Sequence, residues 1–178
     1  DCDKLLSITI PQSVLEIGIY AFCNCDSVTS IDIEEGGFLE YIGERAFSGV
    51  KGNIVIPNSV KYIGDYAFSY GGVTFAINKE SQLTYIGAYA FYGGYNGKDY
   101  GISTVYLSSK VEYVGKNAFY LEGIYIYCEL SSKPSTWLID FSNADSGTVV
   151  WGVSRFEMNQ TDDGFKYILV NDDLLIVG

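Results

Sequence analysis

The residues that decide the fold are Ile54-Val55-Ile56-Pro57-Asn58-Ser59-Val60-Lys61-Tyr62-Ile63-Gly64-Asp65-Tyr66-Ala67-Phe68. This stretch begins with an apolar-x-apolar triplet and ends with a hexapeptide, Ile/Val-Gly-x-x-Ala-Phe. The hexapeptide occurs five times, at successive spacings of 25, 21, 23 and 28 residues, and starts at Ile17, Ile42, Ile63, Ile86 and Val114. The six triplets are residues 8–10, 31–33, 54–56, 75–77, 105–107 and 124–126. The chain is therefore built largely from one repeated unit.

A unit of 21 to 28 residues is too short to enclose its own apolar face, so each unit must be buried by its neighbours in a solenoid. The alternation within each triplet predicts a strand whose outer two side chains point inward, and stacked strands of this kind form a parallel sheet. We expect the hexapeptide glycine to supply a permissive backbone where the chain bends, and Ala-Phe to fill the interior. The sequence predicts about six such turns, because it contains six triplets.

The composition excludes several classes of function. The 178 residues carry 11 basic and 22 acidic side chains, a formal charge of −11, which argues against nucleic acid and against anionic membranes as partners. The chain has no histidine, so Ser–His and Cys–His catalysis and histidine-ligated metal sites are excluded. No apolar run approaches the roughly 20 residues of a spanning helix. We therefore expect no enzymatic activity, no cofactor and no direct membrane insertion.

Acidic pairs occur at Glu34-Glu35, Asp162-Asp163 and Asp172-Asp173. None lies in the D-x-D-x-D-G pattern of a calcium loop, and nothing fixes two carboxylates at the separation that glycoside hydrolysis needs. We interpret these pairs as solvated turns, and we expect no metal site.

The hexapeptides and triplets together resemble the BspA-like leucine-rich repeat family, a class of bacterial surface proteins. The family pattern continues after Ala-Phe with x-x-Cys-x-x-Leu, and Cys25 followed by Val28 fits it. Cys2 followed by Leu5 fits the same place 23 residues upstream. The resemblance implies a β-rich α/β solenoid, a right-handed array of stacked parallel strands, over residues 1–130.

The end of the chain departs from the repeat. Residues 131–152 are similar to the closing segment of such arrays, in which Trp137, Phe141 and Trp151 would cap the last turn. Beyond Gly152, turn signals surround the alternating runs 165–170 and 174–177, which predict short β-hairpin strands. We expect residues 153–178 to form a small β segment that begins a further module.

The four cysteines leave two interpretations open. Cys23 and Cys25 are spaced poorly for a bridge to each other, whereas Cys2 and Cys25 occupy equivalent places on adjacent turns and could approach. The family resemblance favours buried, inert thiols.

On leucine-rich repeats the exposed sheet face is the usual contact surface. The middle residues of the triplets would form an exposed row there, and the candidates are Asp32, Val55, Tyr106 and Tyr125. An insertion at residues 93–101 should form a protruding loop, which adds Tyr95 and Tyr100.

Sixteen tyrosines exceed what a core requires. One set immediately precedes the Ile/Val-Gly pair and another lies two residues before the phenylalanine, so two tyrosine ladders are predicted: Tyr41, Tyr62, Tyr85 and Tyr113, and Tyr20, Tyr66 and Tyr89.

The resemblance implies a non-enzymatic, extracellular cell-surface module for protein–protein interaction or adhesion, with an unidentified host or matrix protein as its partner. Two alternatives stay open. The chain could be a structural spacer in a multi-domain surface protein, or a glycan-binding module that uses its tyrosine ladders.

Overall fold

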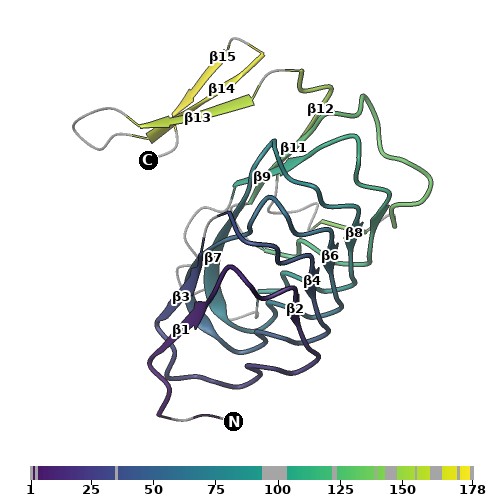
Figure 1. Cartoon of the computed structure of the whole chain (residues 1–178). Helices are drawn as coiled ribbons and strands as arrows, with labels where there is room; N and C mark the ends of the chain where they lie inside the picture. The colour runs from purple at the N-terminus through teal and green to yellow at the C-terminus, as the bar shows by residue number, and fades with distance from the viewer. Residues whose placement is uncertain are drawn as a thin grey trace.

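A computed structural model describes residues 2, 4–34, 36–93, 104–121, 124–138, 140–142, 148–154, 156–160, 166–171 and 173–176. Over these residues the chain winds into a parallel β-solenoid of about five turns, followed by a small antiparallel sheet (Figure 1). The predicted solenoid is confirmed. The sequence predicted about six turns, whereas the structure has about five, because only five strands form the sheet that the hexapeptides begin.

Two parallel ladders run along the solenoid. The first has the order β10-β8-β6-β4-β2, and its two-residue strands are β2 (Glu16–Ile17), β4 (Tyr41–Ile42), β6 (Tyr62–Ile63), β8 (Tyr85–Ile86) and β10 (Tyr113–Val114). The second ladder comprises the pair β1 (Ser7–Ile10) and β3 (Ser30–Ile33), and the sheet of β5 (Lys51–Val55), β7 (Gly72–Ile77), β9 (Thr104–Leu107), β11 (Tyr125–Cys128) and β12 (Thr148–Trp151). Each ladder contributes one wall around a shared interior (Figure 1).

The hexapeptides form a third wall without a helix, so the α/β part of the predicted fold class is corrected for the described residues. Alternate backbone N–H groups donate to the next turn of the solenoid, as from Arg45 to Asp65 at 3.0 Å and from Phe47 to Ala67 at 2.8 Å. The N–H between them, on Ala46, donates three residues back to Gly43. A helix would require every N–H to bond four residues back, and these bonds between turns leave no donors for that pattern.

The hexapeptide glycine has a different role from the one expected. The left-handed backbone conformation occurs two residues later, with φ between 50° and 58° at Tyr20, Arg45, Tyr66, Tyr89 and Asn117. A Cβ on Gly64 would lie 2.6 Å from the backbone nitrogen of Glu44 on the preceding turn. The glycine therefore allows two turns to approach closely, rather than allowing the chain to bend.

The interior placement of the Ala-Phe pairs is confirmed from the second hexapeptide onward, whereas Ala21 in the first hexapeptide is exposed. The alanines at the fifth hexapeptide position from Ala46 to Ala118 are fully buried. The phenylalanine rings form one continuous stack with centroids 5.2 to 5.3 Å apart: Phe22, Phe47, Phe68, Phe91 and Phe119. One aromatic column therefore runs through the core and joins all five hexapeptides.

The end of the chain adds to the solenoid before leaving it. Strand β12 pairs in parallel with β11, and the indole Nε1 of Trp137 donates to the carbonyl oxygen of Val111 at 3.1 Å. The rings of Trp137, Phe141 and Trp151 lie within 5.4 to 6.2 Å of one another. Three antiparallel strands follow: β13 (Phe156–Gln160), β14 (Lys166–Val170) and β15 (Asp173–Ile176). The proposed boundaries at 130 and 152 stay predictions.

Candidate ligand-binding surface

The predicted sheet face exists, and three of its four candidate residues are accessible. Register places Val55, Ala76, Thr104 and Tyr125 side by side across the sheet. Val55 is 59% exposed and Tyr125 is 36% exposed, and Asp32 on β3 is also exposed. These three residues remain candidates for contact with a partner.

The exposure predicted for Tyr106 is wrong, because this side chain is only 6% exposed. The register aligns it with Tyr127, and a small apolar cluster of Tyr106, Tyr127 and Val153 covers this part of the sheet. The Tyr106 hydroxyl donates to the carbonyl oxygen of Val153 at 3.4 Å. The sequence pattern placed Tyr106 in line with Ala76 and Tyr125 across the sheet, but the residue in that line is Thr104.

The other two candidates, Tyr95 and Tyr100, lie outside the described residues. Their role in a contact surface stays a prediction.

The first predicted tyrosine ladder is formed by Tyr41, Tyr62, Tyr85 and Tyr113. Consecutive rings are nearly parallel, with centroids 4.5 to 4.8 Å apart. Burial, with smaller contributions from Tyr85 and Tyr41, raises the pKa of Tyr62 to about 12. The phenol is therefore neutral at physiological pH and can both donate and accept a hydrogen bond.

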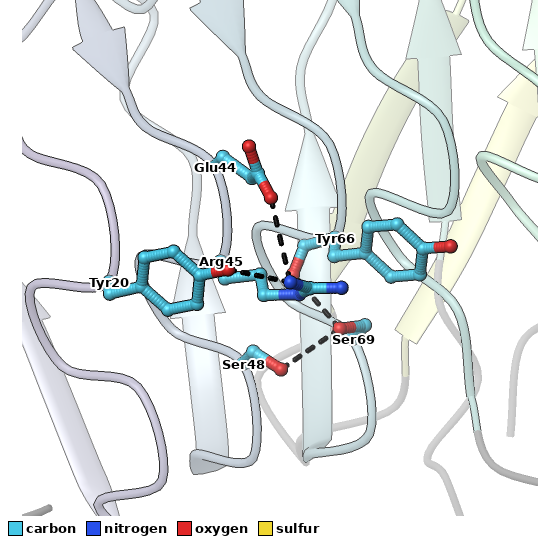
Figure 2. Close-up of polar contacts among 6 residues, drawn as sticks. All are labelled: Tyr20, Glu44, Arg45, Ser48, Tyr66 and Ser69. Atoms are coloured by element: carbon cyan, nitrogen blue, oxygen red, sulfur yellow. Dashed lines mark hydrogen bonds and ion pairs between the residues drawn. The ribbon is translucent and has the colours of Figure 1, made fainter.

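The second ladder contains a guanidinium group between tyrosines (Figure 2). The Arg45 guanidinium carbon lies 4.7 Å from the ring centroid of Tyr66 and 5.6 Å from that of Tyr20. Its Nη1 donates to the Tyr20 hydroxyl at 2.6 Å and lies 3.6 Å from a carboxylate oxygen of Glu44. Cation–π attraction and these polar contacts hold the guanidinium in place among the three side chains.

Further tyrosines enlarge this ladder into a surface. Tyr66 stacks on Tyr89 at 4.9 Å, and Tyr89 meets Tyr92 edge-on at 5.5 Å. Tyr92 in turn contacts Tyr70 at 5.4 Å and Tyr120 at 5.2 Å. We call this continuous set the tyrosine surface, and its members are Tyr20, Arg45, Tyr66, Tyr70, Tyr89, Tyr92 and Tyr120.

The backbone explains why these side chains face solvent. Tyr20, Arg45, Tyr66 and Tyr89 occupy the left-handed position of the hexapeptide, and the backbone N–H of each donates to a carbonyl of the next turn. In the position after the phenylalanine, Ser48 and Ser69 are buried and their Oγ atoms lie 3.0 Å apart. Tyr92 and Tyr120 stand at that same position in later turns and are partly exposed.

The arrangement of the rings decides what the surface offers to a ligand. The Tyr66 ring lies between the Arg45 guanidinium and the stacked Tyr89 ring, so it presents its edge and hydroxyl group. Burial comes first among the causes that raise the pKa of Tyr66 and of Tyr92 above the ordinary value, so these hydroxyls are also protonated at neutral pH. The surface is a neutral, hydrogen-bonding aromatic area with one guanidinium near one end.

The model of the BspA type leucine rich repeat region matches the chain in six copies over residues 1–125. The chain belongs to this family. Comparison with curated proteins gave no match, and comparison with solved structures gave none either. Leucine-rich repeats generally serve protein interaction and are typically non-enzymatic, and the BspA-like family is associated with bacterial surfaces.

Two further observations on this BspA-type chain bear on its chemistry. The described residues hold no group of three or more potential metal ligands. Among the same residues, none forms a helix long and apolar enough to span a bilayer.

Sequence reasoning missed four residues of the tyrosine surface of this BspA-type chain: Arg45, Tyr70, Tyr92 and Tyr120. Tyr92 and Tyr120 each follow the repeated phenylalanine directly, which is a periodic signal in the sequence. Arg45 aligns with the tyrosines of the second ladder, but its place between two rings depends on the turn spacing.

Proposed function

We propose that the chain is an extracellular protein-interaction module that holds a partner protein against its tyrosine surface. The observation that carries this proposal is the continuous contact of six tyrosines and Arg45 along one wall of the solenoid. Tyrosine and arginine are enriched at the centres of protein interfaces, because they offer large contact areas with polar tips at low entropic cost.

A protein partner suits this surface better than a glycan. Sugars bind aromatic residues mainly by lying against an open ring face, whereas the central Tyr66 ring lies between the Arg45 guanidinium and the stacked Tyr89 ring. The exposed edges and hydroxyl groups instead suit backbone and side-chain polar groups of a protein.

The proposed setting is a bacterial cell surface, where the module would adhere to a host or matrix protein or to a neighbouring cell. The formal charge of −11 favours a basic partner, weakly at physiological salt. The sheet-face residues Asp32, Val55 and Tyr125, together with Tyr95 and Tyr100 of the insertion, form a proposed second contact area. A spacer that binds nothing would have no need for a contiguous exposed aromatic surface.

The test compares binding by two variants. Each substitution introduces a residue that the chain already has at the equivalent position of another turn. The surface variant combines Tyr66→Asn, Tyr89→Asn and Tyr92→Ser, because Asn117, Ser48 and Ser69 stand at the equivalent positions of other turns. The sheet variant combines Val55→Thr and Tyr125→Thr, because Thr104 lies in the same row. Both variants should fold, as circular dichroism and thermal melting will verify.

Binding is measured by biolayer interferometry against a panel of purified extracellular-matrix proteins, with a sugar array in parallel. We expect binding to at least one protein, and a loss of about tenfold or more in affinity for the surface variant, since interface hot spots contribute at this scale. The sheet variant should lose less. Binding to sugars alone, or equal binding by wild type and surface variant, would contradict the proposal.

A further inference from the structure

The first two turns of the solenoid place two cysteines next to each other. β1 pairs in register with β3, and Ser7 lies opposite Ser30, 23 residues later. Cys2 and Cys25 precede these residues by five positions each and begin the same local turn: Leu5 N–H donates to the Cys2 carbonyl and Val28 N–H to the Cys25 carbonyl, both at 3.0 Å. Cys2 is therefore the counterpart of Cys25 on the adjacent turn.

The spacing between turns suits a disulfide. Neighbouring parallel strands lie about 4.8 Å apart, within the roughly 4.4 to 6.8 Å between Cα atoms that disulfides span. Burial raises the pKa of Cys25, and a side-chain hydrogen bond with the Cys2 thiol raises it further.

We infer that Cys2 and Cys25 form a redox-sensitive disulfide that covalently joins the first two turns. The oxidant is a small-molecule disulfide such as oxidised glutathione. The Cys2 thiolate attacks it, forms a mixed disulfide and releases one reduced thiol. The Cys25 sulfur then attacks the Cys2 sulfur, the protein disulfide forms, and a second reduced thiol leaves with the proton of Cys25.

Accessibility sets this order of events. Cys2 is exposed and can meet a soluble oxidant, whereas Cys25 is 1% exposed and can reach only a neighbouring sulfur. The position equivalent to Cys25 on the third turn is Val50, so the bond cannot move along the solenoid.

The other two cysteines are positioned differently. The Asn24 N–H donates to the Ser48 carbonyl, so Cys23 occupies the same place in its turn as Ser48 does in the next turn. Cys2 occupies a different place in its turn, the one equivalent to Cys25. Cys128 is fully buried among β9 and β12, opposite Leu107 and Trp151, and burial raises its pKa to about 12. Cys23 is therefore a matched control, since it lies two residues from Cys25 and is partly accessible.

The experiment incubates the full chain with oxidised glutathione and analyses the quenched product by mass spectrometry without reduction. We expect the loss of two hydrogen masses, and a tryptic digest in which the peptide ending at Lys4 is joined to the peptide that contains Cys23 and Cys25. Cys23→Ser should form this link as the wild type does, whereas Cys2→Ser and Cys25→Ser should not. The oxidised wild type should also melt at a higher temperature, and dithiothreitol should reverse the rise.

The inference does not depend on the proposed function, because binding is not measured. Cys2 is exposed, so Cys2→Ser should fold even if Cys25→Ser fails to. A persistent glutathione adduct on Cys2 with Cys25 free would overturn the inference, as would loss of the link in Cys23→Ser.

Discussion

At the scale of single residues, the hexapeptide keeps large side chains in a backbone conformation that they ordinarily avoid. Tyr66 has φ 58° and Arg45 has φ 51°, in the left-handed region that costs a non-glycine residue roughly 1 to 2 kcal/mol. Ring stacking and backbone bonds between turns offset this cost. Because strain of this kind tends to mark functional positions, the left-handed tyrosines support the assignment of the tyrosine surface.

The glycine next to the strand has a steric role that two substitutions can test. Gly64→Ala would place a Cβ 2.6 Å from the backbone nitrogen of Glu44, so the turns must separate, and we expect a loss of about 1 to 3 kcal/mol in unfolding free energy. Gly18→Ala meets nothing within 4 Å and should be neutral or stabilising by about 0.4 to 1 kcal/mol. Urea denaturation followed by circular dichroism measures both, and equal effects would contradict the steric role.

The difference between expectation and structure at this glycine is instructive. Sequence alone shows that a glycine recurs, but both a bend and a close approach of two chains require glycine. The choice between them depends on the distance to Glu44, a residue 20 positions away in the chain. Contacts between turns cannot be obtained from a period alone.

At the scale of elements, periodicity predicted nearly all of the core but misplaced one strand. The triplet at residues 105–107 is two positions out of register, because Val105 pairs with Ile77. A shift of two preserves the alternation of inward and outward side chains, so the sequence pattern fits both registers equally. Tyr106 was misplaced for this reason, and its burial under Val153 comes from a segment 47 residues away.

The phenylalanine column is the element whose loss should be most costly. Phe68 is 4% exposed and stacks between Phe47 and Phe91, so Phe68→Ala should reduce the unfolding free energy by about 3 to 5 kcal/mol through lost transfer energy and a cavity. Phe38→Ala removes a ring that is 65% exposed and should cost within about 0.5 kcal/mol. Thermal melts of both variants give the comparison. A loss at Phe68 as small as that at Phe38 would contradict an interior column.

At the scale of the whole molecule, the sequence predicted the solenoid and both tyrosine ladders, because each follows from one period. The tyrosine surface was only partly predictable. Its cation–π contacts and edge-on ring contacts depend on the lateral spacing of turns, which no linear pattern records. The contact of Asn171 with residues 152–154 could not be predicted either, because these residues lie outside the repeat.

Asn171 links the last strands to residues 152–154, which directly follow β12. Asn171 lies in the turn between β14 and β15, and its Oδ1 accepts from the backbone N–H of Ser154 at 2.8 Å and from the Ser154 hydroxyl at 3.1 Å. Its Nδ2 donates to the Gly152 carbonyl at 3.3 Å. These bonds flank Val153, which is fully buried against Tyr106 and Tyr127. Among the described residues, Asn171 thus joins this turn to the segment on either side of Val153.

Asn171→Gly tests this attachment without straining the backbone, because φ at this position is 50° and glycine adopts it freely. Each lost bond contributes about 0.5 to 1.5 kcal/mol, so we expect hydrogen exchange in β14 and β15 to accelerate about tenfold or more. Exchange in β2 to β10 should be unchanged, because the solenoid has its own core. Ser154→Ala removes only one of the three bonds and should give an intermediate rate. Unaltered exchange in β14 and β15 of Asn171→Gly would show that the strands are held by other contacts, and equal acceleration throughout the chain would show that the two parts unfold as a single unit.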